Sequence, residues 1–182
     1  MRLPTGLIVF FLCLACAVSM GVAGQQRNAA PAQVYESPGP APARYESPDK
    51  SIVAIVFPVG KPEVKGYESR VELRSKSGEL LTQREYLSTD GQHGYSVYKA
   101  AWTPDSSFFV YSLVNSGGHQ PWHSPVEFYT RSDEKIFSLD DALHDAATNP
   151  QFLMSAPDRV TVELWFSKTT RTVPLSALIP KE

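Results

Sequence analysis

The stretch Ile52-Val53-Ala54-Ile55-Val56-Phe57 decides the fold class of this chain. Six consecutive apolar residues, four of them β-branched, are typical of a strand buried on both faces. The segment 67–73 alternates instead, which predicts a half-buried strand with one solvated face. Its apolar set is Tyr67, Ser69, Val71 and Leu73, and its polar set is Glu68, Arg70, Glu72 and Arg74. The turn residues 75–78 and the return over 79–87 complete a β-hairpin.

The same pattern of short apolar segments separated by turns continues through the rest of the sequence. Strands are predicted over 95–102, 108–114, 126–131, 136–137, 159–166 and 171–175. One helix is predicted over 140–147, with Ser138 as its N-cap and Asn149-Pro150 as its end, and the last residues add a helical turn. Because the connections are short, we expect antiparallel pairing. The predicted fold class is mainly β, a meander or sandwich of about eight or nine strands with one or two short helices.

Composition sets the size and excludes some classes of protein. The chain has 182 residues, is 42% hydrophobic and carries a net charge of −2. This length predicts one domain, placed at 51–182. The apolar fraction is too high for a wholly disordered chain. The balanced charge argues against nucleic acid as a partner, because a nucleic-acid binder needs a basic surface.

Residues 1–24 are typical of a secretory signal peptide. Arg2 precedes an apolar stretch over 7–18, which is too short to span a bilayer, and small residues up to Ala23 predict cleavage before Gly24. We therefore expect a periplasmic or secreted protein whose mature chain has no stable membrane span. The alternative is a membrane-tethered lipoprotein with its lipid on Cys16, since Leu14-Ala15 precede that cysteine. Both cysteines lie inside the signal, so the mature chain would have no thiol.

Residues 25–50 are predicted to form a disordered, proline-rich tether. Prolines stand at positions 31, 38, 40, 42 and 48, and proline disfavours helix and central strand. The tetrapeptide Tyr-Glu-Ser-Pro occurs at 35–38 and again at 45–48. We interpret the two copies as a duplicated spacer; the alternative is a recognition motif for a partner.

The segment from Ala100 to Leu139 resembles a single blade of a β-propeller of the TolB or WD40-like type. Such blades carry a Trp-Ser-Pro-Asp-Gly core before an apolar strand, and here Trp102-Thr103-Pro104-Asp105-Ser106 precedes Phe108. A fainter echo lies about 56 residues earlier, at 52–57 and at the 75–78 turn. The resemblance implies blade-like hairpins and no activity. Because propellers need about four to eight blades, one chain cannot close such a ring.

The loop 115–125 is the most unusual segment, because it places His119, Trp122 and His123 after two glycines. Loops of this kind on β scaffolds often carry function. Two histidines four residues apart can share a zinc ion, with His93 as a third ligand and Asp90 as a carboxylate. The alternative is that both histidines bind the loop backbone and Trp122 plugs the edge of the core. We expect no cofactor, with zinc as the alternative.

Aromatic side chains offer a second kind of binding surface. The candidates are Tyr95, Tyr98, Trp102, Trp122, Tyr129 and Trp165. Trp165 shares the solvated face of its strand with Thr161 and Glu163, unless a second layer covers that face.

Catalytic patterns are weak in this sequence. No Gly-x-Ser-x-Gly elbow occurs, and Ser132-x-x-Lys135 falls in a predicted turn. We therefore expect a non-catalytic binding domain, with binding residues His93, His119, Trp122, His123 and Trp165 and an envelope protein or polymer as partner. The alternative is a metal-dependent or other enzyme with its site in the 119–123 loop. A third hypothesis, that several chains complete a blade ring, leaves the oligomeric state open.

Overall fold

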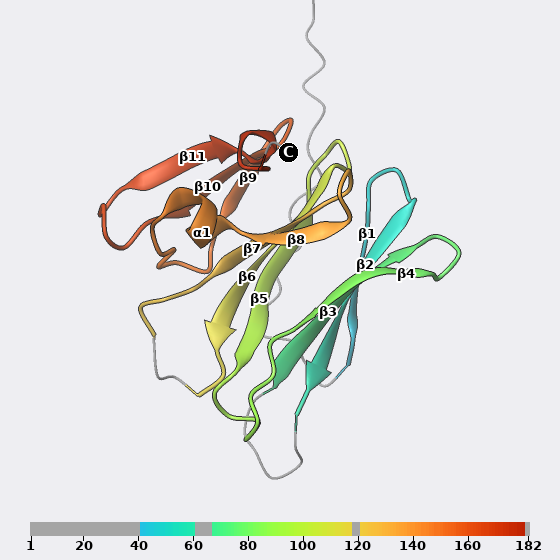
Figure 1. The fold of residues 1–182 in the computed structure, drawn as a ribbon, viewed down its shortest axis with the longest axis horizontal. Helices are drawn as coiled ribbons and strands as arrows, with labels where there is room; N and C mark the ends of the chain where they lie inside the picture. The colour runs from blue at the N-terminus through green and yellow to red at the C-terminus, as the bar shows by residue number, and fades with distance from the viewer. Residues whose placement is uncertain (1–40, 61–66, 118–120, 181–182) are drawn as a thin grey trace, which may run out of the picture.

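The computed structural model describes residues 41–60, 67–117 and 121–180. It confirms the mainly β fold class, because this part of the chain forms eleven strands in three antiparallel sheets, with one short helix and one 3-10 turn (Figure 1). The strands are β1 (Ala43–Glu46), β2 (Ile52–Val59), β3 (Glu68–Ser75), β4 (Leu80–Glu85), β5 (Tyr95–Trp102), β6 (Phe108–Asn115), β7 (Val126–Thr130), β8 (Lys135–Ser138), β9 (Leu153–Ser155), β10 (Arg159–Glu163) and β11 (Thr170–Pro174). The two strands that the sequence did not predict, β1 and β9, are both short.

Strand β1 lies inside the segment expected to be tether. Its residues pair with β2, from Ala43 with Val56 to Glu46 with Val53. Tyr45 is buried in the core and its carbonyl accepts the indole N–H of Trp102 at 3.0 Å. The second Tyr-Glu-Ser-Pro copy is therefore part of the folded sheet and not a spacer, because its tyrosine has a packing role. The first copy, the signal residues and the cysteines lie outside the described residues.

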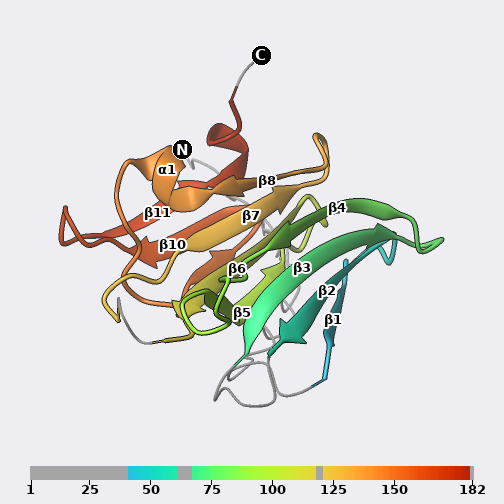
Figure 2. The ribbon, with the colours of Figure 1, turned by 60° about the horizontal axis from the view of Figure 1, so that its bottom comes forward.

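The three sheets form three layers. The first sheet has the strand order β1-β2-β3-β4, the second β5-β6-β7-β8 and the third β11-β10-β9. Figure 2 shows the second sheet between the other two. Neighbouring strands follow one another in the chain, so each sheet is a meander with no crossover.

The middle sheet is covered on both faces. In β6, Phe109, Tyr111 and Leu113 face the first sheet, whereas Phe108 and Val110 face the third. All five side chains are buried. Strands β6 and β7 are thus buried on both faces. Strand β2, for which the sequence predicted this, lies in an outer layer with Val53 and Phe57 only half-buried.

The polar face of β3 differs from its prediction as a solvated face. Glu72 is buried between Arg70, whose Nε lies 3.0 Å from a carboxylate oxygen, and Arg74, whose Nη2 lies 2.7 Å from the other. The Arg70 guanidinium also lies over the Phe57 ring, 4.7 Å from its centroid. The arginine stems cover the apolar outer face, as long cationic side chains do when their charges reach solvent.

The third layer packs on the second through Val160, Val162 and Val173. Helix α1 (Leu139–Leu143) joins this cluster, and the Ser138 hydroxyl accepts the Asp141 N–H at 3.2 Å as predicted for its cap. The helix is shorter than expected because His144 takes a left-handed conformation with φ of 53° and ends it. The 3-10 turn covers Leu175–Ala177. Among the described residues, no helix has the length and apolar character needed to cross a bilayer.

Candidate functional site

Trp122, His123 and Trp165, three of the predicted binding residues, come together in the structure. The ring centroids of Trp122 and Trp165 lie 5.3 Å apart, and the His123 ring stacks on Trp122 at 5.4 Å. The contact joins the loop before β7 to the end of β10, two segments more than 40 residues apart in the sequence. His119 lies outside the described residues.

Phe166, the last residue of the strand predicted over 159–166, adds a third exposed ring. It is 71% exposed, whereas Trp122 and Trp165 are 39% and 38% exposed. Strand β10 ends at Glu163, so the alternation of faces no longer holds at Phe166. We call Trp122, Trp165 and Phe166 the aromatic surface. Exposed rings gathered in one place mark binding surfaces more often than scattered ones do.

Hydrogen bonds hold the aromatic surface in place. Both oxygens of the Asp145 carboxylate accept backbone N–H groups, from Phe166 at 2.8 Å and Ser167 at 3.0 Å. The Trp165 backbone N–H donates to the Ala146 carbonyl at 2.8 Å. The rings are thus presented by a fixed backbone, which lowers the entropic cost of binding a ligand.

A cleft of about 660 Å³ opens beside the aromatic surface. Its lining residues come from β4, β7, α1 and the loops around them: Arg84, His123, Pro125, Glu127, Ser138, Asp140, Asp141, His144, Asp145, Ala146 and Phe166. His123 and Phe166 line the cleft, so the cleft and the aromatic surface form one site.

A histidine–carboxylate contact and an ion pair lie among the residues that line the cleft. The His123 Nε2 lies 2.8 Å from an Asp140 carboxylate oxygen, and the Arg84 Nη1 lies 2.9 Å from a Glu127 oxygen. Glu127 and Asp140 are mostly buried, with side chains 7% and 14% exposed. The pair of Arg84 and Glu127 connects β4 of the first sheet to β7 of the second.

Burial governs the protonation of both carboxyl groups. It raises the pKa of Glu127 from 4.5 to about 7, against the opposing effect of the Arg84 charge, and the Asp140 and Asp141 charges add to the rise. Burial also raises the pKa of Asp140, although the hydrogen bond from His123 and two backbone amides oppose it. The cleft therefore holds a carboxyl group that exchanges its proton near neutral pH.

Glu127→Gln tests this environment through stability. Because the folded protein binds the Glu127 proton more tightly than the unfolded chain, stability falls as the pH rises from about 4.5 to about 7. The difference corresponds to about 3 kcal/mol at pH 8. Gln cannot ionise, so we expect the variant to match the wild type at pH 5 and to be more stable at pH 8, as measured by urea unfolding. Equal pH dependence in both proteins would contradict the assignment.

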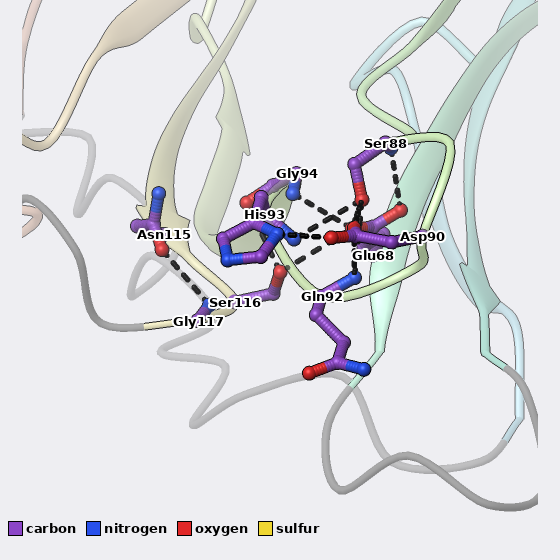
Figure 3. A network of polar contacts seen from close by, with 9 residues as sticks. All are labelled: Glu68, Ser88, Asp90, Gln92, His93, Gly94, Asn115, Ser116 and Gly117. Atoms are coloured by element: carbon purple, nitrogen blue, oxygen red, sulfur yellow. Dashed lines mark hydrogen bonds and ion pairs between the residues drawn. The ribbon is translucent and has the colours of Figure 1, made fainter.

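His93 lies in a separate network, on the loop between β4 and β5 (Figure 3). Its Nδ1 pairs with the Asp90 carboxylate. Glu68 occupies the centre of this network: it accepts the Ser88 N–H and the Gly94 N–H, each at 2.7 Å, and the Ser88 hydroxyl. Burial disfavours the charge of Glu68, but these hydrogen bonds outweigh it and lower its pKa. The network connects β3 of the first sheet and the loop after β4 to the start of β5 in the second sheet.

Zinc binding by His93, His119 and His123 stays a prediction. Each described histidine expected to bind the ion has a carboxylate partner of its own, Asp90 for His93 and Asp140 for His123. Across 41–60, 67–117 and 121–180, no three His, Cys, Asp or Glu side chains are grouped so that they could hold a metal ion. The remaining expected ligand, His119, is outside these ranges.

Three of the other four aromatic candidates belong to the core or pack against it. Tyr129 is fully buried, and Trp102 and Tyr95 pack against the cluster between the first two sheets. Tyr98 is half-buried, and its hydroxyl accepts the Gln151 side-chain amide at 3.0 Å. None of the four contributes to the aromatic surface or lines the cleft.

Sequence reasoning missed the buried acidic residues of the site. Glu127 stands between apolar neighbours in a predicted strand, which is a signal that a carboxylate enters the protein interior. Asp140 stands at the start of the predicted helix, where a carboxylate is favourable without any partner. Its pairing with His123 depends on how the loop folds back onto α1.

No protein-family model, curated protein or solved structure matches this chain. The functional argument therefore depends on the site itself.

Proposed function

We propose that this chain is an exported, non-catalytic binding domain whose ligand occupies the aromatic surface and the adjoining cleft. The observation that carries the proposal is the aromatic surface itself: three rings are exposed, those of Trp122 and Trp165 are in contact, Phe166 follows Trp165 in the chain, and hydrogen bonds fix the backbone beneath two of them. Burying rings of this size is the usual source of affinity in a binding site.

The proposed location is the periplasm or the exterior, after removal of residues 1–24. Lipidation at Cys16 would tether the same domain to a membrane. In either case the partner is a protein or a polymer of the cell envelope.

The core between the sheets contains no cysteine among the described residues, so the domain depends on apolar packing and not on disulfides.

A two-dimensional NMR titration of the indole N–H signals tests the proposal. The chain has three tryptophans: Trp122 and Trp165 belong to the site, and Trp102 is bonded to Tyr45 in the core and serves as an internal control. Basic, acidic and apolar peptides and neutral oligosaccharides are the probes. We expect at least one class to shift the Trp122 and Trp165 signals and leave the Trp102 signal in place. If no class does so, the proposal fails.

Trp122→Ala and Trp165→Ala should each weaken the binding found in that titration by about tenfold or more, because central aromatic anchors contribute most of the affinity. Isothermal titration calorimetry measures the change. Tyr67→Ala is the matched control, since Tyr67 has a similar exposure of 38% but lies next to β3. Equal losses in all three variants would indicate a general loss of structure.

A second candidate function is an enzyme that uses His123 as a proton acceptor. The 2.8 Å contact between His123 and Asp140, beside the buried Glu127, favours this candidate. Hydrolysis of nitrophenyl esters and glycosides tests it: turnover that disappears in His123→Gln, with the NMR titration unchanged, would replace the binding proposal.

A further inference from the structure

The face of Trp165 already holds a positive charge. The Lys168 ammonium lies 3.3 Å from the centroid of the Trp165 ring. Lys168 stands at the tip of the turn between β10 and β11, in a left-handed conformation with φ of 55°. A cation over an indole face is attracted by the ring quadrupole. The aromatic surface is therefore suited to a cationic group.

The charge of the cleft points the same way. Four carboxyl groups line it, from Glu127, Asp140, Asp141 and Asp145, against the guanidinium of Arg84 and the imidazoles of His123 and His144. Arg84 is paired with Glu127, and Asp145 is used in holding the turn. Asp141 is exposed at the rim. A site with this balance attracts basic ligands and repels acidic ones.

The cleft adjoins a second hollow of about 390 Å³ beside α1, which has a mixed polar and apolar lining. The two share Arg84, Ser138 and Asp141, and the second is lined further by Ile136, Phe137, Ala142, Leu178 and Pro180. The two hollows adjoin at these three shared residues, so together they extend from Phe166 past Asp141 to Leu178 and Pro180. A ligand that fills both must present one group to each, as neighbouring side chains of an extended peptide do.

From these features we infer that the occupant is an extended peptide segment of a partner protein that carries a lysine or arginine next to an apolar side chain. The basic group enters the cleft beside Phe166, Trp165 and Asp141, and the apolar group lies against Leu178 in the adjoining hollow. This inference rests on the proposed binding function and gives it a partner class. Lys168 competes with the ligand for the Trp165 face.

A capped pentapeptide, Ala-Leu-Lys-Leu-Ala, and its analogue with Gln in the central place are the probes for calorimetry and the indole N–H titration. We expect the lysine peptide to bind more tightly and its affinity to fall with added salt. Lys168→Gln should tighten its binding about two- to fivefold, because the ring is vacated and a like charge is removed. Asp141→Asn should weaken it about twofold, and Glu79→Gln, a charge change outside both hollows, should leave it unchanged.

The remaining outcomes separate this inference from the proposed function. Equal binding of the Gln peptide, or a Lys168→Gln variant that binds less tightly, would overturn the cationic partner while leaving a binding site in place. Spermidine that binds as tightly as the peptide would assign the site to free polyamines and overturn the peptide partner. Binding of neutral oligosaccharides alone would also overturn the peptide partner. If no probe shifts Trp122 and Trp165, the proposed function fails as well.

Discussion

Phe109→Ala should lower the free energy of unfolding by about 4 kcal/mol and Tm by about 15 °C. Phe109 is fully buried at the centre of the cluster between the first two sheets. Its ring contacts three other aromatic rings, with centroids 5.2 Å away for Trp102, 5.5 Å for Tyr45 and 5.7 Å for Tyr111. Removing it leaves a cavity that these large rings cannot fill by small movements.

Phe166→Ala is the matched control for this prediction. It removes the same atoms from a side chain that is 71% exposed, so we expect a change within about 0.5 kcal/mol. Urea unfolding followed by far-ultraviolet circular dichroism measures both variants. Similar losses for the two would mean that Phe109 is not in the core described.

Gly94→Ala should cost a similar amount, about 4 kcal/mol, although it adds only one methyl group. A Cβ at Gly94 would lie 2.6 Å from the Glu68 carboxyl carbon and even closer to the Tyr86 carbonyl oxygen. The backbone must therefore move, and the Gly94 N–H to Glu68 hydrogen bond at 2.7 Å is lost with it. The effect comes from the close approach of two strands and not from an unusual φ angle.

Gly78→Ala separates these two causes. Gly78 has φ of 90° and open space where a Cβ would stand. Only backbone strain opposes the substitution there, so we expect a loss of about 1 kcal/mol. Thermal unfolding should thus give Gly94→Ala a clearly lower Tm than Gly78→Ala. The reverse order would contradict the network in Figure 3.

The fold class could be predicted because apolar runs and turns are local signals. The hairpin turn at 75–78 and the strand at 108–114 both appear where expected. The segments 52–57 and 108–113 lie in β2 and β6, and each of these is the second strand of a four-stranded sheet. Which of the two lies in the middle layer is not a local property, because it depends on the sheet that β9, β10 and β11 supply.

The site was predicted only in part, for a similar reason. Trp122, His123 and Trp165 stood out as aromatic and titratable residues in exposed positions. Glu127 and Arg84 did not, because a partly buried ion pair between two sheets depends on a contact between residues 43 positions apart. β1 was missed because proline-rich composition outweighed the short apolar alternation of Ala43 and Tyr45.

The meander order of the strands also sets the order in which the protein can fold. The first two sheets are complete once residue 138 has emerged, and their shared cluster can then form. The opposite face of the middle sheet is covered only when the third sheet forms, and the last strand of that sheet ends at Pro174. This face carries Phe108, Val110 and Phe128. A chain that emerges from its N-terminus would therefore expose a patch of aromatic and β-branched side chains until Pro174 has emerged, and during that interval it would be most prone to aggregate or to need a chaperone.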